Sequence, residues 1–293
     1  MTITIREATS SDLTDIMSFA ASDRDDQFKY FASKNPTLTF AAVDDSGQPL
    51  GFITSWQNLV HPHHQNIRIV LSPKKLPTSA VIDALVKREQ QQLDTLGITL
   101  PLIVMYWEPQ TRKTVYFEKH GYHIFRKTWM PDLLLDNIPS TNTHLPDDVV
   151  TLRDVWAKPA QKKAAISLLR QQYEIVHQDN PAAHLSIENW AKNIDGELPY
   201  LDWSLATVVD GDFKALSFVF PGDAESSLDV GWLTDVDNDA HHVIELLNIQ
   251  CQLFKQTQLR SIFGELDSTD PVAMQVKAKF PWEPAPAWIS LIK

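Results

Sequence analysis

Hydrophobic and polar residues follow two patterns along the first half of the chain. Alternation with a period of two predicts strands at 2–6, from residue 38 and at 50–56, and the turn at 44–47 joins the last two as a hairpin. Helical spacing predicts one helix with Leu13, Ile16, Met17 and Ala20 on one face, capped by Ser10 or Ser11, and another over about 79–96 that is ended by Gly97.

Two buried strands follow this pattern, at 67–71 and in "LPLIVMYW", and the segment "PQTRKTVYFEKHGYHIFRKTWM" predicts a short helix, a stop at Gly121 and a closing strand. The order of elements is therefore β, α, hairpin, β, α, β, α, β. This order predicts a mixed sheet covered by helices.

The same order repeats in the second half. It comprises strand "VVTLRD", helices within 159–193, a hairpin that turns at Asp210 and Gly211, strand "SLDVGWLTDV", a helix at 240–256, strand "SIFGEL", helix "DPVAMQVKAKF" and strand "AWISLI". The segment 135–148 lacks apolar periodicity, which is typical of a linker. We therefore predict an α/β (mixed α+β) protein with tandem domains at 1–134 and 149–293 and a linker at 135–148. Each domain is expected to hold a mostly antiparallel mixed sheet flanked by helices, with two middle parallel strands that splay apart.

Composition narrows the class of protein. A chain of 293 residues with 43% hydrophobic content supports two packed cores, and a net charge of −11 argues against a nucleic-acid groove while mildly favouring cationic partners such as amines. The one cysteine, Cys251, excludes an internal disulfide and a cysteine metal cluster. Because the sequence contains no signal-peptide pattern and no long apolar run, we expect a cytoplasmic protein without a membrane partner.

Several motifs together carry a family resemblance. In the first half they are "TIREATSSDLTDI", "FAAVDDSGQPLGFI", the strand-loop-helix of 67–96 and "VYFEKHGY"; in the second half they are "LATVVDGDFKALSFV", "VGWLTDV" and "ELDSTDPVAMQVKAKFPW". Over nearly the whole chain the two halves resemble tandem copies of the GNAT N-acyltransferase fold. The resemblance implies acetyl-CoA as the acyl donor, an amine as the acceptor, direct transfer and no metal. It identifies neither the acceptor nor the oligomeric state.

The resemblance places the coenzyme at the strand-loop-helix of the first half. Backbone groups near Val70 and Leu71 would bind the carbonyl and the pantetheine arm, and the start of the helix would bind pyrophosphate through its free N–H groups. The phosphate end would comprise Ser72, Lys74, Lys75, Ser79 and Ala80.

The loop departs from the family pattern, in which a basic or amide residue and two small residues approach the phosphates. Leu76, Ser79 and Val81 occupy those positions, so the glycines are missing. The alternative interpretation is that Lys74 and Lys75 are solvated and that Thr78 or Ser79 caps a helix.

The equivalent loop of the second half is acidic. Asp235, Asp237 and Asp239 stand where pyrophosphate would lie, and like charges there repel. A calcium loop is excluded because Ala240 and Leu246 replace its glycine and glutamate. We therefore place the coenzyme in the first half.

Two residues are candidates for catalysis. Glu108 directly follows a buried strand and is the candidate base, although it is equally consistent with a solvated strand end. Tyr116 is the candidate acid, but the family register places Phe117 at the position of the acid, and one residue on a helix rotates a side chain by about 100°.

Two further alternatives bear on function. His61, His63 and His64 lie close together in a proline-containing loop, which without partner carboxylates is more typical of a surface segment than of a metal site. The missing glycines, the displaced tyrosine and the acidic second loop also favour a different class of protein, a non-catalytic binding or scaffold protein that kept the fold.

Overall fold

The structure is a computed structural model that describes residues 2–25, 27–74, 77–141 and 145–293. The chain forms two compact units. The first contains the chain up to Lys127 together with Asp179–Ala183 and Pro286–Lys293, and the second contains Thr128–Gln178 and His184–Ala285. Among the described helices none has the length and apolar character needed to cross a membrane.

The sheet of the first unit has the order β1-β2-β3-β4-β5-β14-β6. Its strands are β1 (Thr4–Glu7), β2 (Thr39–Val43), β3 (Pro49–Gln57), β4 (Gln65–Leu71), β5 (Leu102–Trp107), β14 (Ala287–Ile292) and β6 (His123–Trp129). The β4–β5 pair is parallel, whereas β1–β2, β2–β3, β3–β4 and β5–β14 are antiparallel. This is the mixed, mostly antiparallel sheet that the sequence predicts.

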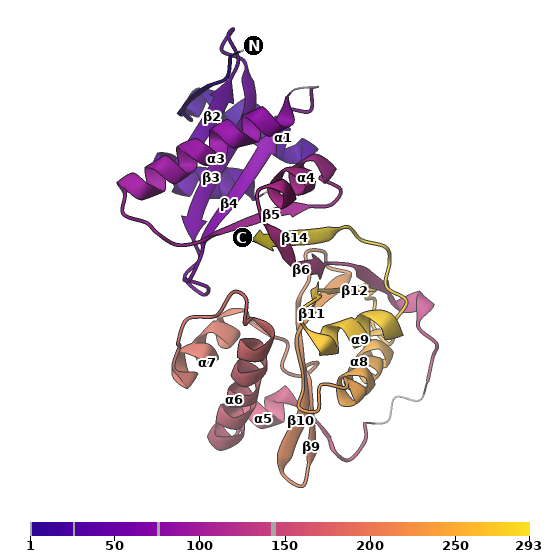
Figure 1. Cartoon of the computed structure of the whole chain (residues 1–293). Coiled ribbons are helices and arrows are strands. Elements are labelled where there is room, and N and C mark those ends of the chain that lie inside the picture. Colours follow the sequence, from indigo (N-terminus) through magenta and orange to yellow (C-terminus); the bar gives the residue numbers. More distant parts are fainter. Residues whose placement is uncertain (1, 26, 75–76, 142–144) are drawn as a thin grey trace. The chain divides into compact units, whose positions relative to one another are not determined.

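Helices cover both faces of this sheet (Figure 1). Helices α1 (Leu13–Ser22) and α2 (Phe28–Lys34) bury Ile16, Phe19 and Phe28 on one face. Helices α3 (Thr78–Thr95) and α4 (Thr111–Lys119) bury the other face through Leu85 and Phe117, among others. The burial of these apolar side chains on two faces of one sheet is the main stabilising contribution in this unit.

The second unit repeats this plan. Its six-stranded sheet has the order β7-β12-β11-β10-β9-β8, in which β11 and β12 are parallel. The strands are β7 (Asp132–Leu134), β12 (Ser261–Gly264), β11 (Ser227–Asp235), β10 (Asp212–Pro221), β9 (Leu205–Val209) and β8 (Val149–Thr151), and β13 (Leu266–Asp267) pairs with the end of β6. The helices are α5 (Leu152–Trp156), α6 (Pro159–Val176), α7 (Ile187–Gly196), α8 (His241–Phe254) and α9 (Pro271–Lys279).

The units differ from the predicted domain ranges at the two places where the chain passes from one sheet to the other, after β6 and before β14. The last strand, β14, lies between β5 and β6 of the first sheet, while β7 pairs with β12 of the second. A strand joins the sheet in which its backbone groups are paired, and sequence order alone does not fix which sheet that is. The predicted linker also contributes to the second core, because Leu135 and Ile138 are 2% and 4% exposed. Residues 142–144 of that segment lie outside the described residues.

Several local predictions need correction. Leu13, Met17 and Leu96 are about half exposed, so the buried stripes of the two helices are narrower than predicted. A 3₁₀ turn, Ser10–Asp12, precedes α1, and Thr9 caps that turn where Ser10 or Ser11 was expected to cap the helix. The predicted strand "VVTLRD" ends at Thr151, where α5 begins. The sequence pattern also missed the short helix α2.

The predicted splaying of the middle strands is confirmed in the first unit. In the first unit β4 and β5 pair only at Gln65–Leu102, Asn66–Ile103 and Ile67–Val104, after which each continues without the other. In the second unit β11 continues to Asp235, although its pairing with β12 ends at Val230. In both units the strand that precedes the long helix therefore leaves one backbone edge without a strand partner.

Candidate functional site

Helix α3 starts without a capping side chain among the described residues. Pro77 is its N-cap, Thr78 is its first residue, and the first backbone bond runs from Val81 N–H to the Pro77 carbonyl. Neither Thr78 nor Ser79 therefore caps the helix as the alternative interpretation expected. The predicted residues Ser79 and Ala80 are exposed in the first turn, where N–H groups have no partner within the helix.

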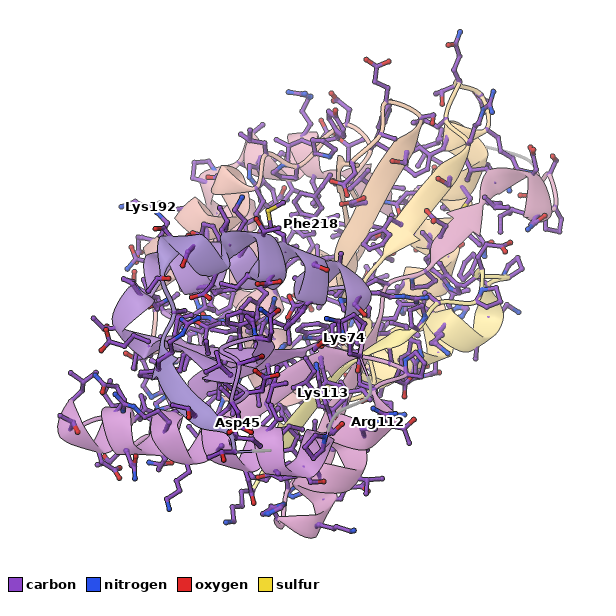
Figure 2. All side chains as sticks on the ribbon, turned by 90° about the horizontal axis from the view of Figure 1, so that it is seen from above. Asp45, Lys74, Arg112, Lys113, Lys192 and Phe218 are labelled. Atoms are coloured by element: carbon purple, nitrogen blue, oxygen red, sulfur yellow. The ribbon has the colours of Figure 1, made fainter. Side chains whose placement is uncertain are left out.

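Positive side chains accompany this helix start. Lys74 is exposed in the loop, and Arg112 of α4 places its Nη1 3.5 Å from the Thr78 hydroxyl; both are labelled in Figure 2. The first turn of α3 contains no acidic residue. A helix N-terminus is itself electropositive, so nearby cations are unfavourable there unless an anion joins them. The arrangement suits a phosphate group; Lys75 lies outside the described residues.

The unpaired edge of β4 presents Ile69 and Leu71. Ser72 donates its N–H to the Leu50 carbonyl and Val70 pairs with Phe52, so the polar groups of Ser72 and Val70 face β3. The backbone polar groups of the alternate residues, Ile69 and Leu71, point away from β3, to the side where β4 is no longer paired with β5. Of the two backbone positions predicted to contact the coenzyme arm, only Leu71 is on the open edge.

Two buried charged side chains meet that edge. The Lys113 ammonium donates to the Ile69 carbonyl at 2.5 Å and to Asp23 Oδ2 at 2.7 Å, and the Leu71 N–H donates to Asp23 Oδ2 at 3.2 Å. The two side chains are 2% and 10% exposed. Gln110 adds a bond to the other Asp23 oxygen. The internal ion pair therefore binds two polar groups of this edge, the Ile69 carbonyl and the Leu71 N–H.

The turn after α1 aims a second carboxylate at β4. Arg24 has a left-handed backbone conformation, φ 57°, which ends α1 and orients Asp23 and Asp25 toward the strand. Asp25 pairs with Arg68 at 2.7 Å, and burial raises the pKa of Asp25 above its usual range. Arg68 also lies against three rings, with its Cζ 4.5 to 5.3 Å from the ring centroids of Phe31, Trp56 and Trp288.

No sequence pattern singles out these charged residues. A signal was present in "IRIV", because an arginine inside an apolar strand needs a buried partner. The acidic turn with Asp23 and Asp25 supplies that partner for Arg68. Lys113 gave no local signal, since it reads as an ordinary exposed residue of a short helix.

The candidate acid, Tyr116, is oriented toward α3. Its hydroxyl donates to Asp83 Oδ1 at 2.5 Å, and burial together with this bond raises its pKa. Residues four apart share a helix face, so Phe117, which is fully buried, lies on the same side of α4 as Lys113. The residue on the splay side of α4 is thus Phe117, the position that the family register favours.

The candidate base, Glu108, lies at the end of β5. One carboxylate oxygen is 2.9 Å from the Lys127 ammonium, and the other is 3.3 Å from the Ala287 N–H. About a third of the side chain is exposed. Glu108 is thus held by two partners, and accepting a proton from an amine would compete with Lys127.

The histidine-containing loop has a structural role within the first unit. His61 is 7% exposed, with Nδ1 2.6 Å from the Asn180 carbonyl, and His64 Nδ1 is 3.0 Å from the Asn180 side chain. Burial lowers the pKa of His64. These contacts hold Asp179–Ala183 against the loop, which differs from the predicted surface segment.

A carboxylate of the protein itself binds the first N–H groups of helix α8 in the second unit. The fully buried Asp235 accepts N–H bonds from Asp237 at 3.1 Å, His242 at 3.1 Å and Val243 at 3.4 Å. Asp239 accepts the N–H of His241. The first N–H groups of α8 are therefore bound by the protein's own carboxylate.

Comparison with protein-family models and with curated proteins gives no match. Solved structures do match. A GCN5-related N-acetyltransferase from Sphaerobacter thermophilus has a TM-score of 0.68 at 12% identity, covering 99% of this chain and 95% of that one. A tandem GNAT protein from the clavulanic acid biosynthesis pathway has a TM-score of 0.53 at 13% identity, covering 100% and 98%.

A third structure is the GCN5-related glucosamine N-acetyltransferase region of a fungal multi-domain β-N-acetylglucosaminidase. It has a TM-score of 0.60 at 12% identity. The match covers 100% of this chain and 38% of that one. At these identities the similarity concerns the fold. The two helix-covered mixed sheets and the matches over the full length of the chain together show that it has the tandem GNAT fold.

Proposed function

We propose that this protein is an acetyl-CoA-dependent N-acetyltransferase whose first unit holds the coenzyme. The observation that carries the proposal is the start of α3. Within the described part of the chain it has no capping side chain and no acid in its first turn, and Lys74 and Arg112 lie near it. A pyrophosphate with its negative charges fits these N–H groups and cations. The start of α8, where Asp235 is bound, does not fit one.

Transfer would follow from the position of the thioester beside β4. The amine nitrogen would attack the acyl carbonyl carbon, the C–S bond would break, and the amine would lose one proton as the thiolate leaves. Glu108 is the proposed base once Lys127 has moved away, and Leu71 N–H is a proposed donor to the arm or the carbonyl. Tyr116 is a candidate for the proton to the thiolate, although its hydroxyl is bonded to Asp83.

The acceptor is proposed only as a class, a small-molecule or protein amine. The net charge of −11 favours cationic partners, and acetylation would remove the positive charge of such an amine. We propose a cytoplasmic location, because the one cysteine of the sequence, Cys251, fits a reducing compartment.

The second candidate function is a GNAT-fold binding or scaffold protein without acyl transfer. It is favoured by the buried Lys113–Asp23 pair on the β4 edge and by Asp235 at the start of α8. Both features place the protein's own charges where a coenzyme would bind. They are compatible with the enzyme only if the pair in the first unit opens.

Calorimetric titration with acetyl-CoA, run beside a thiol-release assay on a panel of amines, separates the two candidates. The enzyme predicts binding that is weakened in Lys74→Glu and unchanged in Lys192→Glu, a control with the same charge reversal on the exposed surface of α7 (Figure 2). It also predicts thiol release with at least one amine.

The outcomes for the native protein are distinct. Binding that is equally weakened by both charge reversals would contradict a specific site at α3. An absence of binding at millimolar acetyl-CoA would favour the scaffold protein.

A further inference from the structure

We infer that the Lys113–Asp23 pair is an internal ligand of the β4 edge that competes with the coenzyme arm, so that the first unit binds coenzyme only when the pair opens. The inference rests on the proposed function and adds a means of regulation to the same site. It concerns two residues that no sequence pattern singled out.

The pair reproduces the hydrogen bonding of an amide laid along β4. The Lys113 ammonium supplies a donor to the Ile69 carbonyl, as an amide N–H would, and the Asp23 carboxylate supplies an acceptor to the Leu71 N–H, as an amide C=O would. The pantetheine arm of coenzyme A carries two secondary amides. An arm bound in the splay would therefore need the same two backbone groups.

Occupation by the pair excludes the arm sterically as well as chemically. Lys113 is 2% exposed, and its ammonium lies in bonding distance of both β4 and Asp23. An amide N–H that donated to the Ile69 carbonyl from this side would have to take the position of that ammonium. Coenzyme and pair are thus alternative occupants, and the fraction of molecules with the pair open scales the apparent affinity.

The neighbouring Asp25–Arg68 pair provides a matched control. Its carboxylate, Asp25, comes from the same turn after α1, its cation, Arg68, belongs to β4 itself, and both side chains are similarly buried. However, it leaves the Ile69 and Leu71 groups untouched, because the backbone of Arg68 faces β3 and its side chain lies on the aromatic rings. Loss of this second pair tests the effect of an altered buried charge without opening the edge.

The experiment compares three full-length proteins. They are the native chain, an open variant with Asp23→Asn and Lys113→Met, and a control variant with Asp25→Asn and Arg68→Met. Each double variant removes both charges together, so that neither is left buried and unpaired. Calorimetry measures binding of coenzyme A and of adenosine 3′,5′-bisphosphate, which carries phosphates but no amide arm.

If the pair is open in about 10% or less of the native molecules, the open variant should bind coenzyme A at least about tenfold more tightly than the native chain. Its affinity for the bisphosphate should be unchanged. The control variant is expected to bind both probes like the native chain. Tight binding in the open variant alone, with none in the native chain, would support the internal ligand and contradict the proposed native function.

Equal affinity of the native chain and the open variant for coenzyme A would overturn the inference and leave the proposed function standing. An absence of binding of both probes to all three proteins would overturn both. If the open variant does not fold, the amide resonance of Leu71 in the native chain gives the answer: saturating coenzyme A should shift it, because its acceptor changes. An unshifted resonance would overturn the inference.

Discussion

The two units differ most where each long helix begins. In the first unit the first turn of α3 has exposed residues, Ser79 and Ala80, with Lys74 and Arg112 nearby. Its carboxylate, Asp23, binds the edge of β4 and is neutralised by Lys113. In the second unit Asp235 binds the first N–H groups of α8 directly. Among the described residues, a carboxylate therefore binds the helix start in the second unit and none is seen to do so in the first. The difference lies in the position of a carboxylate and in the backbone of the N-cap, because Ala240 before α8 is left-handed at φ 58° whereas Pro77 before α3 has φ −73°.

A second difference concerns the buried polar contact between the long helix and the sheet. In the first unit the hydroxyl of Ser55 on β3 bonds with Glu89 of α3, and in the second the hydroxyl of Ser217 on β10 bonds with Gln250 of α8. Gln250 is neutral and has further bonds to the Trp203 and Ser217 carbonyls. Burial raises the pKa of Glu89 to about 7, so the first unit carries a pH-sensitive group where the second does not.

The largest expected effect is on the free energy of unfolding, when a partner of the buried carboxylate is removed, of Asp23 in the first unit or of Asp235 in the second. Lys113→Met leaves Asp23 buried without its cation and should lower the free energy of unfolding by about 3 to 5 kcal/mol. His242→Ala, beside Asp235 at 3.6 Å, should cost far less, because that carboxylate keeps three N–H donors. Urea unfolding followed by circular dichroism measures both. Equal losses would contradict the distinction between the units.

The next effect is a dependence of stability on pH. The folded pKa of Glu89, about 7, lies above its unfolded value, so the folded state binds more protons between about pH 4.5 and 7, and stability is lost as the pH rises through that range. Glu89→Gln, which imitates Gln250, should flatten this dependence and stabilise the protein at pH 8 by about 2 kcal/mol. Thermal unfolding at pH 5 and pH 8 measures it. An unchanged pH dependence would show that Glu89 is not the source.

A smaller effect concerns coenzyme affinity at the two helix starts. Replacing both Lys74 and Lys75 by Glu should weaken acetyl-CoA binding by about 1 to 2 kcal/mol, because two negative charges would then face the phosphates. Replacing Asp237 and Asp239 by Lys in the second unit should leave the affinity within about twofold, since Asp235 still fills the start of α8. Calorimetry compares the two. A larger response to the second change would show that the coenzyme binds the second unit and that the first-unit site is wrong.

The smallest effect is expected at Tyr116. Tyr116→Phe removes the bond to Asp83, whose side chain is mostly exposed, and should lower the free energy of unfolding by about 1 kcal/mol. We expect less than about a tenfold loss of turnover, because the raised pKa and the bond to Asp83 make the hydroxyl a poor acid. A loss near 10²-fold in the thiol-release assay would instead establish Tyr116 as the general acid.

The sequence predicted the fold well because the fold depends on periodic burial. Helix α3 and the turn at Gly121, whose φ is 84°, follow directly from apolar spacing and glycine chemistry. The exchange of β7 and β14 between the sheets did not follow, since a short apolar strand fits either sheet equally well. Strand partners are chosen by three-dimensional pairing, which leaves no local mark.

The site was predicted only in part. The α3 start and the acidic second loop were visible as Lys74, Lys75 and the three aspartates. The pair between Asp23 and Lys113 joins residues 90 positions apart, and each one alone is an ordinary polar residue of a helix or its end. Charges that are exposed in the isolated elements become buried only when the elements pack, so their partners were out of reach of a sequence pattern.

The most direct test of the central claim is a hydrogen–deuterium exchange footprint of acetyl-CoA on the full chain. The account predicts slower exchange at the end of β4 and the first turn of α3, residues 70–81, with no change at 235–243 around the start of α8. Protection at 235–243 with none at 70–81 would contradict it.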